Sequence, residues 1–157
     1  MSIILSKMKK TQYILDNILF DSSWELAIYM YLRDFGHSFE YHPDFEIPYK
    51  IDEDAEKFYI FHPDFKINGK IVEVKSNYLF DHFSEKEQAK IELLETLGVD
   101  IWTKDEVKPF IDYVDQNYGK GYLASRSKEL VMQSENIDFI EASAELKIRQ
   151  IPAPSRL

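Results

Sequence analysis

The sequence predicts an α/β fold with a mixed central sheet flanked by helices. Three observations support this prediction: an Asn-Gly pair at 68–69 between two strand-like runs, helical patterns on either side of those runs, and the short apolar run "VDIWT" after the second helix. Helices and strands that alternate along a chain are typical of layered α/β folds. The chain has 157 residues and no linker rich in Pro, Gly or Ser, so one compact domain with its own core is expected.

The first predicted helix follows a lead-in or short strand at residues 11–20. Asp21 or Ser22 can cap its free N–H groups, and Gly36 can end it. Its apolar residues recur three or four positions apart, as on a helix that buries one stripe. Glu25 lies roughly 90° from the centre of that stripe, so we expect it at the flank, neither buried nor fully exposed. The stripe consists of Trp24, Ala27, Ile28, Tyr31, Leu32 and Phe35.

A repeated motif, H-P-D-F-x-I-x-x-K, occupies residues 42–50 and 62–70. The first copy reads as part of a strand broken by Pro43 and Pro48. The second copy contains Asn68-Gly69, which between two strand-like runs predicts a two-residue hairpin turn. The first copy has no such turn and no acid two residues before its lysine. We therefore interpret it as a neighbouring strand under similar packing demands.

The hairpin fixes which side chains meet. Counting outward from the turn places Phe65 opposite Val72, Asp64 opposite Glu73, and His62 opposite Lys75. Side chains alternate between the two faces of a strand. One face should therefore be apolar and pack in the core. The other face should be polar and carry His62, Asp64, Glu73 and Lys75 together.

Two further helices and a tail complete the chain. Ser84 and Glu87 have capping-box spacing before a helix that ends at Gly98, and another helix starts near Pro109. Residues 124–157 have helical composition but a weak apolar stripe. The predicted organisation is therefore a domain at 1–123 and a partly helical C-terminal appendage at 124–157, with its last residues disordered.

Composition narrows the function. The formal net charge is −9, which argues against a free-standing, tight DNA binder, because such proteins usually present a basic surface. Binding to nucleic acid would then need a local basic path, metal ions or a partner protein. The chain has no cysteine, so disulfides and Cys-based zinc sites are excluded. No apolar run approaches the ~18 residues of a membrane span, and we expect a cytoplasmic protein without membrane contact.

The polar face of the hairpin points to a metal site. Cross-strand neighbours such as Asp64 and Glu73 have Cβ atoms about 5 Å apart, and their like charges repel. A divalent ion would relieve the repulsion, and a small set of oxygen ligands suits Mg²⁺ or Mn²⁺. Lys75 on the same face could orient a water and stabilise charge on a phosphate. This combination is suited to metal-assisted hydrolysis of phosphodiester bonds.

These residues also resemble a known family. "HPDF" at 62–65 followed by "EVK" at 73–75 is similar to the P-D…(D/E)-x-K pattern of the PD-(D/E)XK nuclease superfamily, and the chain resembles compact tailed-phage endonucleases and transposon nuclease subunits over about Tyr13 to Val114. The resemblance implies a restriction-endonuclease-like core and a DNA substrate, in a bacterial or phage-infected cell. It also implies that Asp64 and Glu73 hold Mg²⁺ or Mn²⁺, that Lys75 is the catalytic lysine, and that Glu25 supports the metal through water.

Other interpretations stay open. The polar face could simply be solvated, with Lys75 paired to Glu73, or the fold could serve as a non-catalytic nucleic-acid-binding or assembly module. His62 could be a metal ligand or a proton shuttle. Lys86 and Lys90, one helical turn apart, could bind the phosphate backbone of a substrate. The sequence does not distinguish DNA from RNA, or a homodimer from a chain whose DNA is delivered by a protein partner.

Overall fold

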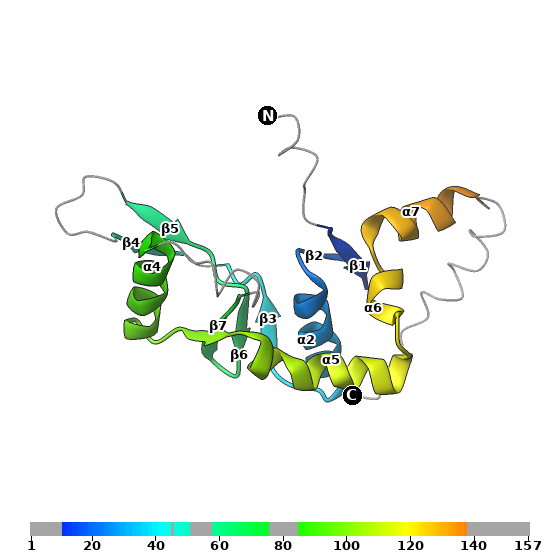
Figure 1. Ribbon diagram of the computed structural model, residues 1–157, viewed down its shortest axis with the longest axis horizontal. Coiled ribbons are helices and arrows are strands. Elements are labelled where there is room, and N and C mark those ends of the chain that lie inside the picture. The colour runs from blue at the N-terminus through cyan, green and yellow to red at the C-terminus, as the bar shows by residue number, and fades with distance from the viewer. Residues whose placement is uncertain (1–10, 45, 51–57, 76–84, 138–157) are drawn as a thin grey trace. The chain divides into compact units, whose positions relative to one another are not determined.

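Residues 11–44, 46–50, 58–75 and 85–137 are described by the structure, a computed structural model (Figure 1). The chain divides into two units. The central unit is His37–Pro109, and the terminal unit combines Met1–Gly36 with Phe110–Leu157. The boundary that the sequence analysis places at 123/124 stays a prediction.

The central unit is built on a mixed four-stranded sheet. Its strands lie in the order β3 (Phe39–Tyr41), β6 (Phe65–Ile67), β7 (Lys70–Val74) and β8 (Asp100–Trp102). The first three are antiparallel neighbours, whereas β8 runs parallel to β7. Parallel neighbours need a crossover, and helix α4 (Glu85–Thr96) supplies it between β7 and β8. The α/β fold with a mixed sheet and flanking helices is therefore confirmed.

The hairpin between β6 and β7 has the predicted register. Asn68 and Gly69 have φ angles of 50° and 85°, as a two-residue primed turn requires. Ile67 pairs with Lys70, and Phe65 pairs with Val72. Phe65 and Val72 are almost completely buried, so the face predicted to be apolar does pack in a core.

A separate two-stranded ribbon joins β4 (Ile47–Tyr49) to β5 (Tyr59–Phe61). The prediction that Pro48 interrupts a strand was wrong, because Pro48 lies inside β4 and pairs with Ile60. A ribbon of two strands has only edge strands, where proline's missing N–H is tolerated.

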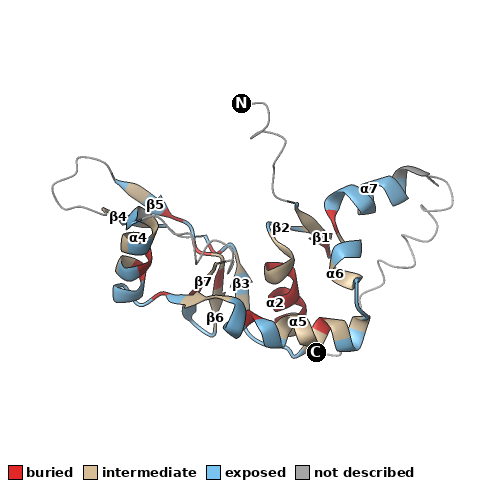
Figure 2. Ribbon diagram, viewed as in Figure 1, coloured by how far each residue is buried: buried red, intermediate tan, exposed pale blue. Residues whose placement is uncertain are grey.

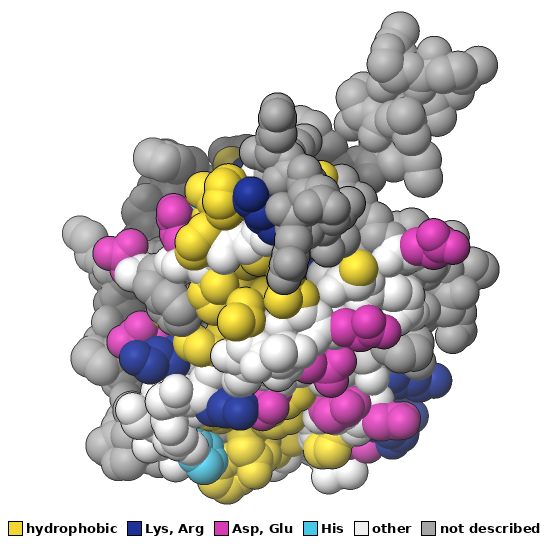
Figure 3. All heavy atoms as spheres, turned by 90° about the vertical axis from the view of Figure 1, so that its left-hand side faces the viewer, with side chains coloured by type: hydrophobic (Ala, Val, Ile, Leu, Met, Phe, Trp, Pro, Cys, Tyr) yellow, Lys and Arg dark blue, Asp and Glu magenta, His cyan; other side chains and the backbone are white. Residues whose placement is uncertain are grey.

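The two faces of the ribbon differ. The inner face packs with α4 and the sheet in one apolar cluster, made of Ile47, Tyr49, Tyr59, Phe61, Ile71, Leu93, Leu94, Val99 and Ile101. The outer face and the end of α4 leave Phe58, Ile60 and Leu97 more than half exposed. Figure 3 shows hydrophobic side chains gathered on this side of the molecule.

The terminal unit begins with a hairpin that the sequence pattern did not resolve. Strand β1 (Tyr13–Leu15) pairs with β2 (Ile18–Phe20) across the turn Asp16-Asn17. Both turn residues have positive φ angles, 54° and 63°. Asp and Asn adopt this left-handed backbone more readily than most residues, so a turn without glycine is possible here.

Helix α2 (Ser23–Asp34) follows, with Ser22 as its N-cap. The Ser22 Oγ accepts the Glu25 N–H, as an N-cap does, and the Ser22 hydroxyl donates to the Glu25 carboxylate. The predicted single stripe was only partly right. Leu26 and Met30 outside it are fully buried, whereas Phe35 inside it is 58% exposed. Figure 2 shows much of α2 as buried. The helix is buried over more than one face, so one apolar stripe does not describe it.

Helix α5 (Lys104–Tyr118) begins five residues before Pro109, so the start predicted at that proline was wrong. The Thr103 N–H and hydroxyl both donate to the Glu106 carboxylate. This Thr-x-x-Glu cap starts the helix, and Pro109 then lies one turn inside it, where it removes one backbone hydrogen bond.

The segment after residue 123 is tied to the first strand. It forms the end of α6 (Tyr122–Ser125) and helix α7 (Lys128–Ile137). Ile14 N–H donates to the Arg126 carbonyl oxygen, and Lys128 N–H donates to that of Gln12. Arg126 Nε returns a hydrogen bond to the Ile14 carbonyl. The partly helical character predicted for this segment is thus seen as far as residue 137, and the predicted disorder concerns residues outside the described part.

A buried acid links α2 to α5. The Asp34 carboxylate accepts hydrogen bonds from the hydroxyls of Tyr113 and Tyr118, and it forms an ion pair with Arg33 at 2.9 Å. Burial opposes ionisation of Asp34, but the hydrogen bonds from Tyr118, Tyr113 and Arg33 hold its pKa below the ordinary value. The side chain is only 5% exposed, so its charge depends on these partners.

We expect Asp34→Asn to destabilise the terminal unit by about 2–4 kcal/mol, since it removes the buried negative charge that pairs with Arg33 and weakens the hydrogen bonds donated by the two tyrosines. Urea unfolding followed by circular dichroism measures the change. Asp44→Asn, at an exposed position, is the matched control and should stay within about 0.5 kcal/mol of the unsubstituted chain. Equal stability of the two variants would contradict the role given to Asp34.

Candidate metal and phosphate site

Asp64 lies where the hairpin ladder ends. The pairing of β6 with β7 stops at Phe65 and Val72, and Asp64 Oδ2 accepts the N–H of Val74 at 2.8 Å. The Asp64 side chain thus takes the place of the next ladder bond. This contact holds the carboxyl against β7, next to Glu73.

Glu73 is buried, with 7% of its surface exposed. Its Oε2 lies 3.5 Å from the Nζ of Lys75, whose side chain is 17% exposed. Its other oxygen, Oε1, is buried and has no hydrogen-bond partner among the described residues. A buried carboxylate oxygen without a hydrogen-bond partner lowers the stability of the folded chain. A cation or hydrogen-bond donor that binds to this oxygen would remove that cost.

The Asp64 carboxyl is strongly perturbed. Burial, then the charge of Glu73, and then a hydrogen bond that only the protonated acid can donate to Glu73 raise its pKa to about 8. The Val74 N–H and the charge on His42 act in the opposite direction but are smaller. Without a cation, the pair therefore favours a single negative charge shared by two carboxyl groups.

The face that carries Glu73 is not the solvated polar face that was predicted. Ile71 lies two residues before Glu73 on the same face, and Ile101 pairs with Glu73 across β7 and β8. Both isoleucines pack on the apolar cluster under α4 and the ribbon. The interpretation of this face as merely solvated is therefore wrong, although its ion pair between Lys75 and Glu73 does exist.

These residues fit a small divalent cation. Two adjacent carboxyl groups, one with an unpaired oxygen, supply the hard oxygen ligands that Mg²⁺ and Mn²⁺ prefer. The ion would also remove the repulsion that raises the pKa of Asp64. Such ions keep several waters and can take further ligands from a substrate phosphate.

The remaining predicted residues lie elsewhere or stay predictions. Glu25 belongs to the terminal unit, so its proposed support of the metal through a water molecule stays a prediction from sequence. The expectation that Glu25 lies at the flank of its helix, only partly buried, was wrong, because its side chain is buried. Lys90 Nζ lies 6.0 Å from the centre of the Phe61 ring, and the side chain of Lys86 is outside the described part. His62 lies near Glu46, with Nδ1 and Oε1 3.9 Å apart, and both are exposed.

The sequence reasoning missed His42. Strand β3 pairs with β6, so the first H-P-D copy follows a strand beside the second copy. The His42 N–H donates to the Asp64 carbonyl oxygen at 2.8 Å. The repeated H-P-D motif could have indicated this contact, since two similar motifs that follow or precede neighbouring strands can lie side by side.

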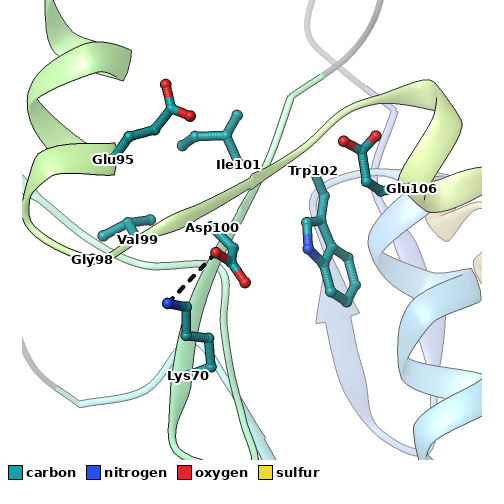
Figure 4. A pocket seen from close by; sticks show the side chains of 8 residues that line it. All are labelled: Lys70, Glu95, Gly98, Val99, Asp100, Ile101, Trp102 and Glu106. Carbon is teal, nitrogen blue, oxygen red and sulfur yellow. Dashed lines mark ion pairs between the residues drawn. The ribbon is translucent and has the colours of Figure 1, made fainter.

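A hollow of about 360 Å³ opens along β8 (Figure 4). It contains an ion pair between Lys70 and Asp100 at 3.6 Å. Its acids are exposed, and none of the predicted catalytic residues contributes to it, so we do not assign chemistry to it. Its lining consists of Lys70, Glu95, Gly98, Val99, Asp100, Ile101, Trp102 and Glu106.

Among the described residues, no helix is both long and apolar enough to cross a membrane. Searches against protein-family models, curated proteins and solved structures find no match to this chain.

The raised pKa of Asp64 predicts a pH-dependent stability in the absence of divalent ions. The unfolded chain releases this proton near its ordinary pKa of 3.8, whereas the folded chain keeps it up to about 8. The folded state therefore binds more protons in between, and the free energy of unfolding should fall from about pH 5 to about pH 8. Urea titrations in a chelator, at several pH values, measure this slope.

Asp64→Asn should flatten the slope, because the amide cannot ionise, and Asp44→Asn should leave it unchanged. Parallel slopes in the unsubstituted chain and Asp64→Asn would show that Asp64 ionises normally.

Proposed function

We propose that this protein is a metal-dependent endonuclease that hydrolyses phosphodiester bonds, with DNA as the substrate. The observation that carries the proposal is the buried Glu73 with the partly buried Asp64 and Lys75 beside it, and with one Glu73 carboxylate oxygen left unpaired among the described residues. A binding surface for nucleic acid does not need two adjacent acids that are shielded from solvent. A metal site for phosphoryl chemistry does.

The order of elements supports the same proposal. Helix α2, strands β3, β6 and β7, helix α4 and strand β8 follow one another, with only the last strand pair parallel. This succession agrees with the restriction-endonuclease-like core implied by the sequence resemblance. The resemblance also supplies the roles proposed for Asp64 and Glu73 as metal-binding residues and for Lys75 as the catalytic lysine.

The chemistry divides among these residues as follows. Hydrolysis forms a bond from a water oxygen to phosphorus, breaks one ester P–O bond, and moves a proton from the water to the departing oxygen. Bound Mg²⁺ or Mn²⁺ supplies Lewis acidity to the phosphate and lowers the pKa of a bound water. Asp64 and Glu73 hold that ion, and Lys75 places its ammonium group where negative charge develops on the phosphate.

A non-catalytic nucleic-acid-binding or assembly module is the second candidate. The ion pair between Lys75 and Glu73, at 3.5 Å, favours it, because Lys75 already neutralises much of the charge on Glu73 without a metal. The raised pKa of Asp64 favours the nuclease, since that pair stays short of positive charge. Activity measurements separate the two candidates.

The negative net charge of the chain affects how a DNA substrate can bind. A net charge of −9 repels the phosphate backbone at long range. We therefore propose that a partner protein brings the DNA, or that a homodimer combines two sites on one duplex. Either arrangement would supply contacts that a single acidic chain lacks.

Cleavage of supercoiled, linear, nicked and branched DNA in Mg²⁺ or Mn²⁺ tests the function. Lys75→Ala should lower the cleavage rate by at least about a hundredfold while metal binding is retained, because its contribution is made in the transition state. Lys66→Ala is the matched control, since Lys66 also follows an acid by two residues and lies on the paired strand. Metal-independent DNA binding without cleavage in the unsubstituted chain would favour the second candidate.

The two H-P-D copies are expected to differ in activity. Asp64→Ala should abolish cleavage, because it removes one of two metal ligands, whereas Asp44→Ala should keep a sizeable fraction. Asp44 is exposed and follows β3 outside the ladder. Both variants are compared under the same metal and salt conditions, with folding checked by circular dichroism. Equal loss of activity in two folded variants would mean that both acids serve one site.

A further inference from the structure

The outer face of the ribbon formed by β4 and β5 presents its side chains in cross-strand pairs. Side chains alternate between the two faces of a strand, so every second residue belongs to this face. The antiparallel register of the ladder, extended by one residue at each end, gives the pairs Glu46 with His62, Pro48 with Ile60, and Lys50 with Phe58.

Contacts at both ends of the ribbon agree with this pairing. His62 Nδ1 lies 3.9 Å from Glu46 Oε1, and Lys50 Nζ lies 4.4 Å from the centre of the Phe58 ring. One end of the outer face thus carries a carboxylate, and the other end carries an ammonium group. Residues 46 and 50 are four apart in sequence, or about 13 Å along an extended strand.

The middle of the outer face is apolar and uncovered. Ile60 is 55% exposed, Phe58 is 62% exposed, and Pro48 beside Ile60 is also exposed. The inner face of the ribbon is already filled by the apolar cluster around Leu94. Adjacent exposed apolar side chains with polar groups at their rim are typical of a surface that binds another protein.

We propose that this face binds the same face of a second copy of the chain, in a dimer with two-fold symmetry. The two-fold axis would lie between the two faces and cross both ribbons at the level of the central pair, so β4 runs in opposite directions in the two copies. Glu46 then lies opposite the partner's Lys50, and the same ion pair recurs at the other end. Ile60 lies opposite the partner's Ile60 at the centre.

Charge complementarity favours a second copy over nucleic acid as the occupant. A phosphate backbone would attract Lys50 but repel Glu46 at the other end of the face. A copy of the same face matches both charges, because the two-fold axis exchanges its ends. The two strands have three residues each, so the ribbon is smaller than the ~800 Å² per partner of a standard interface, and we expect a weak dimer.

The inference concerns self-association alone and holds whether or not the chain cleaves DNA. If the proposed function is also correct, it selects the homodimer from the two arrangements proposed above for binding of the substrate.

Sedimentation equilibrium of the full chain at about 1–500 µM measures the association. We expect the unsubstituted chain to dimerise within this range. Ile60→Ser should weaken the dimer by at least about tenfold, because Ile60 meets its own copy at the centre of the interface. Leu97→Ser is the matched control and should leave association unchanged, since Leu97 is 51% exposed but lies outside the ribbon, next to the end of α4. Circular dichroism verifies that both variants fold.

Charge exchange tests the symmetry of the interface. Glu46→Lys and Lys50→Glu should each weaken self-association by at least about tenfold, because each places like charges opposite one another at both ends. The double variant should restore the dimer, since reversal of both signs keeps opposite charges in register. An equimolar mixture of the two single variants should form heterodimers, because one carries only acids at these two positions and the other only lysines.

Three results would overturn the proposal. The first is a chain that stays monomeric up to about 500 µM. The second is a dimer that Ile60→Ser and the charge variants leave unchanged, since its interface would lie elsewhere. The third is a fluorescein-labelled DNA duplex that binds the monomeric chain and is weakened by Ile60→Ser and Lys50→Glu, which would assign this face to DNA. None of these measurements depends on cleavage, so failure of the dimer and failure of the proposed nuclease activity are recognised separately.

Discussion

The register of the β6–β7 hairpin is the constraint on which the candidate site depends. Both strands lie inside the sheet, between β3 and β8, and their apolar partners Phe65 and Val72 are almost completely buried. A slip of one residue would turn those side chains out of the core. The packing of the core therefore keeps Asp64 beside Glu73 in spite of their mutual repulsion. The energy that holds two like charges together comes from burial of apolar surface on the opposite face.

Several elements of both units could be predicted because their signals are local. The Asn68-Gly69 turn specifies the hairpin by its own backbone preferences, and Ser22 and Gly36 mark the ends of α2 in the same way. The start of α5 was misplaced because Pro109 is a stronger signal in sequence than the Thr103 cap that begins the helix. Burial around α2 could not be predicted from one stripe, since it depends on segments far away in the sequence.

The candidate site shows the same division between local and distant causes. Counting along one hairpin is enough to place Asp64 next to Glu73. The burial of Glu73 depends on α4 and the ribbon, which cover its face through the cluster around Leu94. The position of His42 depends on the pairing of β3 with β6, which no turn between the two strands specifies. Short-range patterns thus identified the acids, whereas the surroundings that perturb them come from tertiary structure.

The hydrogen bonds between β1 and the segment at 126–128 have a consequence for how the chain folds during synthesis. Ile14 and Arg126 are 112 residues apart in sequence, whereas the central unit is one continuous stretch, His37–Pro109. The ribosome therefore completes the central unit before it adds the residues that pair with β1. Contacts between distant residues also form late because a long loop must close first. Until Arg126 and Lys128 have been synthesised, the hairpin of β1 and β2 lacks its final backbone partners, so the terminal unit is completed after the central unit.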